Sequence, residues 1–468
     1  MSNTKNLNRR FFMKGASATA LIGSAIGGGL AIPSAVNAKG MGYISMSMSY
    51  DLDEEFNRIG SGDYKWDSIR RNARPHDVPF PMGVADMDFR TLPHITEALM
   101  KRMGHQNWGY QGPPSYFYEN IIAWNKKRYN QDIKPGSILN SHGVLDGCLS
   151  ILKLHNTSGG PVLVQTPGYS GFFGTVRNAQ FSSVENPLRL IDGRWEMDLD
   201  LMAKQIDKDD IKIILFCNPA NPTGNCWSPT EMRAMGDLCI EKGVLVVADE
   251  IHCDFVNKGA TYTPYATLGE KYAMSSYTLK STSKSFNLAA HHVAYLFSDN
   301  MEMIDNLKKS GHQRGSLNAL GMIACNAAYL HGASYMDDTQ SYIDGNCHIL
   351  EDFCNESMKD VKYRKHEGTY LAFLDCSSVA KKLGKPDDGA RVGDMLKNFF
   401  IEKAGVNLNP GENYGLGGEG YMRMNLATTN YKLRGALDAM KMAILSLIHI
   451  SEPTRLLSIS YAVFCLKK

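Results

Sequence analysis

The sequence predicts an α/β protein built on a mostly parallel sheet that is wrapped by helices. From residue 138 onward, short apolar segments alternate with longer helical patterns, and the clearest strands are residues 161–165, 211–216, 244–248 and 293–297. Because these runs are apolar at nearly every position, we expect both faces of the sheet to be buried. Polar segments directly follow several strands, at the edge of the sheet where such folds place their ligands.

The size and charge of the chain narrow the class of protein. At 468 residues it exceeds the size of a single hydrophobic core, so two lobes are expected. We assign residues 89–319 to a large lobe, and residues 50–88 and 320–445 to a smaller lobe with a strand near residues 368–375. The formal net charge of +2 provides no basic field, which argues against nucleic acid as a partner.

The first 38 residues have the layout of a twin-arginine export signal. Arg9 and Arg10 precede a weakly apolar stretch rich in glycine, serine and alanine, and the segment closes on Ala38, a small residue that a signal peptidase accepts. We therefore expect cleavage after Ala38, a flexible leader over residues 39–49, and a periplasmic or otherwise exported protein. An uncleaved membrane anchor is the alternative.

The C-terminal end of the sequence changes character abruptly. The amphipathic pattern of a final helix, residues 431–445, gives way at Ser446 to a segment that resembles spurious ends found on proteins translated from environmental sequence assemblies. We assign residues 446–468 no function and regard them as a non-native tail.

Ten cysteines occur without the spacing of a metal site, and no metal site is predicted from them. We interpret them as small buried hydrophobic residues. A disulfide formed after export is the alternative.

Polar segments after two of the strands carry candidate chemistry. Residues 218–224 read Asn-Pro-Ala-Asn-Pro-Thr-Gly, so that Asn221 can be held toward a ligand, although the segment taken alone is also an ordinary turn. Asp249 ends the strand 244–248, where a buried carboxylate requires a cation, and a protonated pyridine nitrogen would supply one. A metal cluster of Asp249, His252 and Asp254 is the competing interpretation.

Lys284 lies in a third segment, Ser-Thr-Ser-Lys, directly after an apparent strand at residues 276–280. A lysine flanked by small hydroxyl residues can reach an aldehyde that is anchored by a phosphate and form an imine with it. A solvated side chain is the alternative for any isolated lysine. The order of Asn loop, strand-end Asp and Ser-Thr-Ser-Lys favours the imine.

These segments resemble the motifs of fold-type I pyridoxal-phosphate enzymes, in the class I/II aminotransferase superfamily. Within that superfamily the chain resembles the PatB/MalY-like branch of cystathionine and cysteine-S-conjugate β-lyases, and the resemblance covers about residues 50–445. It implies the aspartate aminotransferase-like fold, with a large cofactor-binding lobe and a smaller α+β lobe. The matching segments are residues 84–89, 218–224, 249–252, 283–288 and 423–425.

The resemblance implies a role for each matching residue around pyridoxal 5′-phosphate. It makes Lys284 the lysine that forms the imine, and Asp249 the partner of the pyridine nitrogen. Asn221 would bond the phenolic oxygen of the cofactor, with His252 nearby. Tyr169 matches the aromatic residue that stacks on the pyridine ring.

The phosphate of the cofactor is expected at the start of a helix that follows the strand at residue 138. The backbone amides of Gly143, Val144 and Leu145 can hold it there. Ser281 and Ser283 flank the lysine, and Ser281 is the preferred hydroxyl for the phosphate.

The resemblance also implies a dimer and a substrate anchor. Tyr110 matches a tyrosine that family members lend to the phosphate of the neighbouring subunit, and Arg423 matches the arginine that pairs with the substrate α-carboxylate. One departure is His292, preceded by His291, where many aminotransferases have an arginine for the phosphate. A second is the segment 426–430, where relatives commonly end in Pro-Arg.

The expected reaction begins with removal of the substrate α-proton by Lys284 while Arg423 holds the carboxylate. The resemblance favours β-elimination of a thiol from cystathionine or a cysteine S-conjugate, with release of pyruvate and ammonia. Transamination of amino acids is the alternative. A third possibility is a non-catalytic ligand-binding module, against which Lys284 and Asp249 together argue.

Overall fold

The computed structural model describes residues 49–71, 78–156, 159–312, 316–386 and 389–451. The expected export signal at residues 1–38, the leader up to residue 48 and residues 452–468 of the tail lie outside these ranges. The described residues belong to one compact unit. The lobe boundaries given above stay a prediction.

The main sheet has seven strands in the described part of the chain. Their order across the sheet is β2 (Ile138–Ser141), β10 (Ala294–Phe297), β9 (Ser276–Ser281), β8 (Leu245–Asp249), β7 (Ile213–Cys217), β3 (Val162–Thr166) and β4 (Ser183–Pro187). Strand β10 is antiparallel to both of its neighbours, whereas the pairs from β9 to β4 are parallel. The predicted α/β fold with a mostly parallel, mixed sheet is confirmed.

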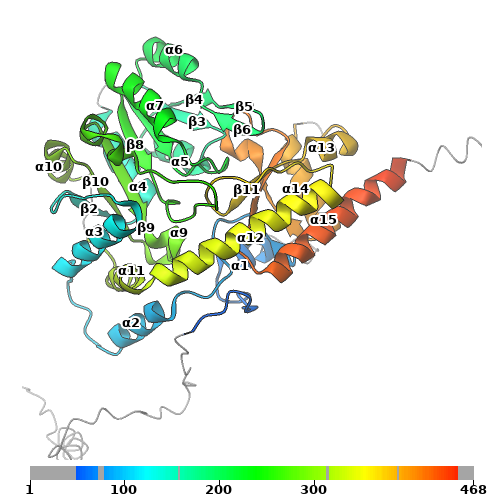
Figure 1. Cartoon of the computed structure of the whole chain (residues 1–468), viewed down its shortest axis with the longest axis horizontal. Helices are drawn as coiled ribbons and strands as arrows, with labels where there is room; N and C mark the ends of the chain where they lie inside the picture. Colours follow the sequence, from blue (N-terminus) through cyan, green and yellow to red (C-terminus); the bar gives the residue numbers. More distant parts are fainter. Residues whose placement is uncertain (1–48, 72–77, 157–158, 313–315, 387–388, 452–468) are drawn as a thin grey trace, which may run out of the picture. The chain divides into compact units, whose positions relative to one another are not determined.

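Helices cover both faces of this sheet because successive strand side chains alternate between two apolar cores. Val164, Leu215 and Val247 join the core under α4 (Val144–His155), α5 (Ser170–Asn178) and α10 (Met301–Lys309). Ile214 and Val246 join the opposite core, under α6 (Leu199–Asp209) and α7 (Pro229–Glu241). Figure 1 shows these helices around the strands of the sheet. The hairpin of β5 (Arg189–Ile191) and β6 (Arg194–Glu196), the helix α8 (Glu270–Met274) and the 3-10 turn η1 (Tyr265–Leu268) complete this region.

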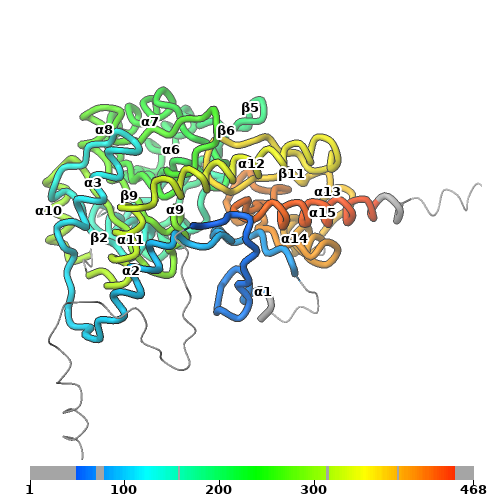
Figure 2. Tube along the Cα trace, turned by 60° about the horizontal axis from the view of Figure 1, so that its bottom comes forward, coloured from blue at the N-terminus to red at the C-terminus, as the bar shows by residue number. Residues whose placement is uncertain are grey.

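A second group of elements comes mainly from the C-terminal third of the chain. Its sheet has the order β11 (Leu371–Asp375), β14 (Tyr421–Asn425), β13 (Asn409–Pro410), and β1 (Phe80–Pro81) pairs in parallel with β12 (Val406–Asn407). Helices α14 (Val392–Ala404) and α15 (Asn430–Ser451) lie side by side, with α12 (Ala333–Ser357) against α15 (Figure 2). The other elements are α1 (Tyr64–Arg71), α2 (Pro93–Met103), α3 (Ser115–Tyr129), α9 (Thr282–Ser285), η2 (Ala289–His291), α11 (Ala319–His331), α13 (Ser377–Leu383) and η3 (Gly411–Tyr414).

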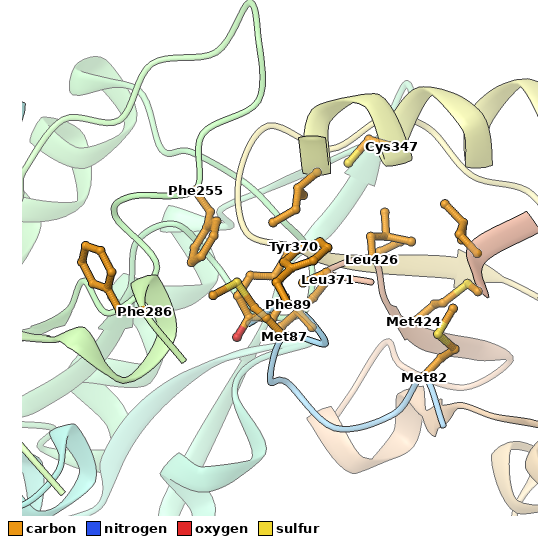
Figure 3. Close-up of a cluster of buried hydrophobic side chains, with 14 of the residues drawn as sticks. Met82, Met87, Phe89, Phe255, Phe286, Cys347, Tyr370, Leu371, Met424 and Leu426 are labelled. Carbon is orange, nitrogen blue, oxygen red and sulfur yellow. The ribbon is translucent and has the colours of Figure 1, made fainter. Parts of the chain in front are cut away.

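A buried apolar cluster joins the segment 82–89 to both groups of elements. Figure 3 shows Tyr370 at its centre, between Phe255 on one side and Leu426 on the other. The rings of Phe255 and Tyr370 meet edge to face with centroids 4.7 Å apart. Met87 and Leu426 are fully buried, so this cluster fixes the segment that carries residues 82–89 against the rest of the fold.

Helix α15 runs further than the sequence pattern indicates. We predicted that the helical pattern ends at residue 445, but the helix continues to Ser451. The Ser446 hydroxyl donates to the Ala443 carbonyl at 2.6 Å, and Leu447 packs against the main core, which explains the continuation. Among the helices in the described ranges, none is both long and apolar enough to cross a bilayer.

The nine cysteines in the described residues are all free. Eight are buried and Cys217 is partly buried, in line with the interpretation of cysteine as a small apolar residue. The alternative of a disulfide finds no pair within these ranges.

Candidate active site

Lys284 lies at the carboxyl end of strand β9, on the one-turn helix α9. The Ser281 hydroxyl begins this turn: it accepts from the Ser283 backbone N–H at 3.0 Å and donates to the Val293 carbonyl at 2.6 Å. Lys284 is partly buried, and its Nζ donates to the backbone carbonyl of Ala85 at 2.7 Å. The lysine amine is therefore held at the edge of the sheet by a residue from the N-terminal part of the fold.

The surroundings of Lys284 favour its neutral amine. Its pKa is lowered from 10.5 to about 8, mainly by burial and then by the positive charge of Arg423, against the opposing effect of Asp86 and Asp249. Such a group can release and take up a proton near neutral pH.

Asp249 ends strand β8, beside β9, and only 2% of the residue is exposed. Its Oδ1 accepts a hydrogen bond from the Ile251 backbone N–H at 3.1 Å, and it forms no ion pair within the described residues. Burial raises the pKa of Asp249 to about 7, while the Ile251 amide and the charge of Lys284 act in the opposite direction. A buried carboxylate in this condition gains a great deal from a cation placed against it.

Arg423 and Asn221 approach each other from different sheets. Arg423 lies on β14 and Asn221 follows β7, and the Arg423 Nη1 donates to the Asn221 Oδ1 at 3.1 Å. The Arg423 Nη2 donates to the Gly83 carbonyl at 2.7 Å, and the guanidinium lies 5.1 Å from the centre of the Tyr414 ring. The buried Arg423 Nε has no hydrogen-bond partner in the described residues. This arginine therefore keeps a donor for a further acceptor such as a carboxylate.

The charge of Arg423 supports a prediction about Lys284. In the protein without cofactor, Arg423→Gln should raise the pKa of Lys284 from about 8 toward 10.5, because it removes a positive charge that opposes protonation of the amine. The measurement is the pH dependence of chemical labelling of Lys284, followed by peptide mass spectrometry. Arg391→Gln is the control, because Arg391 is half exposed and pairs with Asp394. An unchanged labelling midpoint in Arg423→Gln would contradict the coupling.

His252 is buried near the same charges and is held neutral. Burial lowers its pKa well below the usual value, and the charges of Lys284 and Arg423 act in the same direction. Its Nδ1 is buried without a hydrogen-bond partner in the described residues, and its ring meets that of Tyr370 edge to face at 5.7 Å. The free Nδ1 is a position for an additional polar group.

Tyr169 lies at the amino end of α5, shortly after strand β3. Burial and the nearby charge of Asp249 raise the pKa of Tyr169 to about 12. A Cβ added to Gly171 would lie 2.7 Å from the Tyr169 ring and 2.9 Å from the Leu145 side chain. Glycine at position 171 thus lets the Tyr169 ring lie close to α5 and to the start of α4.

The start of α4, where the phosphate is expected, offers backbone donors. Helix α4 begins at Val144 after the N-cap Gly143, and no side chain caps it, so its first-turn amides are available to an anion. The Ser283 hydroxyl lies 2.7 Å from that of Ser281. Since the single proton of the Ser281 hydroxyl goes to the Val293 carbonyl, the Ser283 hydroxyl is the donor in this contact, and our preference for Ser281 as the phosphate ligand stays a prediction.

Other residues singled out from the sequence differ in their exposure. Tyr110 is fully exposed between α2 and α3, and His292 is exposed while His291 is partly buried. Asp254 is buried and bonds the Ser285 hydroxyl at 2.5 Å. No group of metal-ligand residues is gathered in the described residues, so the metal cluster interpretation finds no support there.

The segment 83–88, hereafter the strap, is part of the site, and the sequence had indicated no role for its backbone. Its carbonyls at Gly83 and Ala85 accept from Arg423 and Lys284, and the Tyr370 hydroxyl also donates to Ala85, at 3.0 Å. The Asn425 amide donates to the Val84 carbonyl at 2.7 Å. The strap thus brings both cations of the site to one stretch of backbone.

Two buried cations hold the strap in place. Arg58 donates to the Asp86 carboxylate through both terminal nitrogens at 3.0 Å and reaches the Asp88 carboxylate at 2.9 Å. The Lys65 Nζ, which is fully buried, lies 3.0 Å from the Asp88 Oδ1. These charges lower the pKa of Asp88 to about 2 in spite of its burial. The signal in the sequence was the Asp-Met-Asp pattern at residues 86–88, which we used only as a point of resemblance.

Comparison with known proteins identifies relatives that match most of the chain. Residues 79–440 match the model of the family "Aminotransferase class I and II". Cystathionine beta-lyase PatB of Bacillus subtilis is 33% identical over 401 residues, 85% of this chain and 100% of the relative, and protein MalY of Escherichia coli is 28% identical, over 82% and 96%. A C-S lyase from Staphylococcus hominis, solved with pyridoxal phosphate and L-cycloserine, has 28% identity and a TM-score of 0.78, over 85% and 99%. With the site geometry described above, these matches establish that the chain belongs to the aminotransferase class I and II family.

Proposed function

We propose that the chain is a pyridoxal-phosphate-dependent carbon–sulfur β-lyase that acts on cystathionine or cysteine S-conjugates. The observation that carries the proposal is that the buried Asp249 carboxylate and the Arg423 guanidinium lie near enough to the Lys284 amine for both charges to act on its pKa. The full-length similarity to cystathionine beta-lyase PatB supports the choice of reaction. The proposed products are pyruvate, ammonia and a thiol.

The residues present fit pyridoxal 5′-phosphate. Asp249 has a pKa of about 7 and forms no ion pair in the described residues, which suits a protonated pyridine nitrogen. The uncapped start of α4, at Gly143, Val144 and Leu145, suits the phosphate, together with Ser283 or Ser281. Tyr169 would lie against the ring, with Asn221 and His252 near its phenolic oxygen.

Each proposed step uses groups whose positions are described above. When bound, the cofactor supplies an aldehyde that bonds the amine of the substrate and a ring that accepts electrons. Arg423 binds the α-carboxylate through its guanidinium and so orients the Cα–H bond. The Lys284 amine takes the α-proton, for which its lowered pKa is suited. Asp249 would keep the ring nitrogen protonated. The thiolate would leave from the β-carbon and take up a proton, and water would hydrolyse the remaining aminoacrylate to pyruvate and ammonia.

Transamination is the second candidate, and the family name is the observation that favours it. It would use Lys284 as the same base and Arg423 as the same carboxylate anchor, and Lys284 would then deliver the proton it holds without loss of a thiolate from the substrate.

The experiment that separates the candidates supplies cystathionine alone and, separately, an amino acid with a keto acid. We expect cystathionine to give pyruvate and ammonia in equal amounts together with a thiol. A new amino acid formed only when the keto acid is present would instead establish transamination. A third outcome is also informative. If the purified protein, after incubation with pyridoxal phosphate, shows no visible absorption band from bound cofactor, a non-catalytic module would be favoured.

A homodimer is part of the proposal. Several large apolar side chains near α2, α3 and α11 are exposed in the single chain, as expected of a surface covered by a second copy: Met100, Met103, Trp108, Tyr110, Tyr116 and Leu330. In the dimer, Tyr110 would reach the phosphate of the neighbouring subunit. Sedimentation should give twice the mass of one chain, and Leu330→Asp should shift it toward monomer.

Export through the twin-arginine route is also proposed. It rests on Arg9, Arg10 and the weakly apolar stretch that follows them, and this route carries folded protein, so the cofactor would be loaded before transport. Cell fractionation should find a mature protein that begins near Lys39 outside the cytoplasmic membrane. Replacement of both arginines by lysine should retain an active precursor inside. Identical location of the two forms would contradict the proposal.

A further inference from the structure

The carboxylate of Asp254 contacts Ser285, the residue after Lys284, and takes no part in the site described above. The residue is 5% exposed, and its Oδ2 accepts from the Ser285 hydroxyl at 2.5 Å. Its Oδ1 lies 3.1 Å from the Arg128 Nε and accepts from the Tyr129 hydroxyl. Asp254 therefore holds together α9 and α3, with Ser285 as the α9 partner.

The two segments that meet at this contact are the ones that carry the proposed catalytic groups. Asp254 is two residues after His252 and five after Asp249, and Ser285 is next to Lys284. Figure 3 shows Phe255 and Phe286, the following residue of each segment, on the same side of the apolar cluster. The hydrogen bond between Ser285 and Asp254 thus links the segment that carries Asp249 to the segment that carries Lys284.

Helix α9 needs such a bond because it has only four residues. A single helical turn does not hold its own geometry in water, so its ends must be fixed by contacts outside it. Ser281 fixes the start of the turn through the Val293 carbonyl. Ser285 fixes the end, and Lys284 lies between the two anchored hydroxyls.

Asp254 keeps a cationic partner when the Ser285 hydroxyl is removed. Arg128 already pairs with it, and the Arg128 Nη1 pairs in turn with Asp337 at 2.8 Å. Loss of the serine hydroxyl would therefore leave a buried carboxylate that is still paired with a cation, and the main change would be in the freedom of α9.

We propose that Asp254, through the Ser285 hydroxyl, is a positioning residue that sets the location of the Lys284 amine relative to Asp249. The inference rests on the proposed function. It adds a residue that acts on the site from behind, without contact with substrate or cofactor.

The test compares two variants, each of which removes one of the hydroxyl groups that donate to the Asp254 carboxylate. Ser285→Ala removes the bond to α9, and Tyr129→Phe removes a bond from the opposite side and leaves α9 tied. The first readout uses protein without cofactor: the pH midpoint of chemical labelling of Lys284. The second is the dissociation constant of added pyridoxal phosphate, and the third is rescue by Ser285→Thr.

In Ser285→Ala we expect the labelling midpoint to rise from about 8, because a released turn moves the amine toward water, and burial is the main cause of its low pKa. Pyridoxal phosphate should bind roughly tenfold more weakly, the effect of one charge-assisted hydrogen bond. Tyr129→Phe should keep the parental values, and Ser285→Thr should restore them.

Two results would overturn the inference: parental values in Ser285→Ala, or equal shifts in Ser285→Ala and Tyr129→Phe, which would make Asp254 a structural residue only. If the parent protein does not bind pyridoxal phosphate at all, the proposed function fails, and the labelling comparison still decides the positioning role.

Discussion

Replacement of Lys284 by alanine should lower turnover of cystathionine by roughly a thousandfold or more, because it removes both the amine that bonds the cofactor and the base for the α-proton. The fold should persist, since the Lys284 amine makes one hydrogen bond, to the Ala85 carbonyl, and no ion pair within the described residues. The measurement is the rate of pyruvate release with saturating pyridoxal phosphate.

The matched control for Lys284→Ala is Lys271→Ala, which removes an exposed lysine that pairs with Asp237. Circular dichroism and the thermal midpoint should agree among the parent and both variants within a few degrees. Pyruvate release by Lys284→Ala at a rate near that of the parent would take Lys284 out of the mechanism.

Replacement of Asp249 by alanine should lower turnover by roughly a hundredfold to ten-thousandfold, because the ring nitrogen loses the carboxylate that keeps it protonated. Asp249→Glu should retain part of the activity, since it keeps the charge on a longer side chain. The two variants are assayed side by side for pyruvate release. Near-parental rates in both would contradict the role of Asp249.

Removal of the Asp249 charge, which should lower activity, should raise the stability of the protein without cofactor. The carboxylate's folded pKa of about 7 lies above its unfolded value near 3.8, so the stability it contributes is present below that unfolded value and is lost as the pH rises through about 7. Asp249→Asn should therefore stabilise the cofactor-free protein by about 2 to 4 kcal/mol at pH 8, and much less at pH 4. Urea unfolding at both pH values checks this. A variant that is less stable than the parent at pH 8 would show that the carboxylate is better compensated than its surroundings indicate.

The sequence predicted those parts of the fold and site that depend on local pattern. Strand β8 is apolar at each position before Asp249, so both its burial and the cost of the carboxylate could be inferred from one segment. Lys284 was proposed as the imine-forming lysine in the same way, from its neighbours and from its order after Asn221. The relative placement of these groups then follows from the sheet, which brings the ends of β8 and β9 together.

Features that depend on contacts between distant segments could not be predicted. The Ala85 carbonyl that receives Lys284 has no signature in the sequence, because every residue carries the same acceptor. The pairing of Arg58 with Asp86 and Asp88 requires knowledge of how the N-terminal segment folds back. The end of α15 was placed too early because its continuation depends on packing of Leu447 against the core and not on the helical pattern alone.

The strap also determines where the enzyme is sensitive to mutation. Since its acceptors for Lys284 and Arg423 are backbone carbonyls, no single substitution can delete them, and a deep mutational scan should find Val84 and Ala85 tolerant of small side chains. The sensitive positions should be the side chains that anchor the strap, Arg58 and Lys65. In the sequence both are far from Lys284. Loss of activity would then arise not only at the reacting groups but also at residues that never touch the substrate.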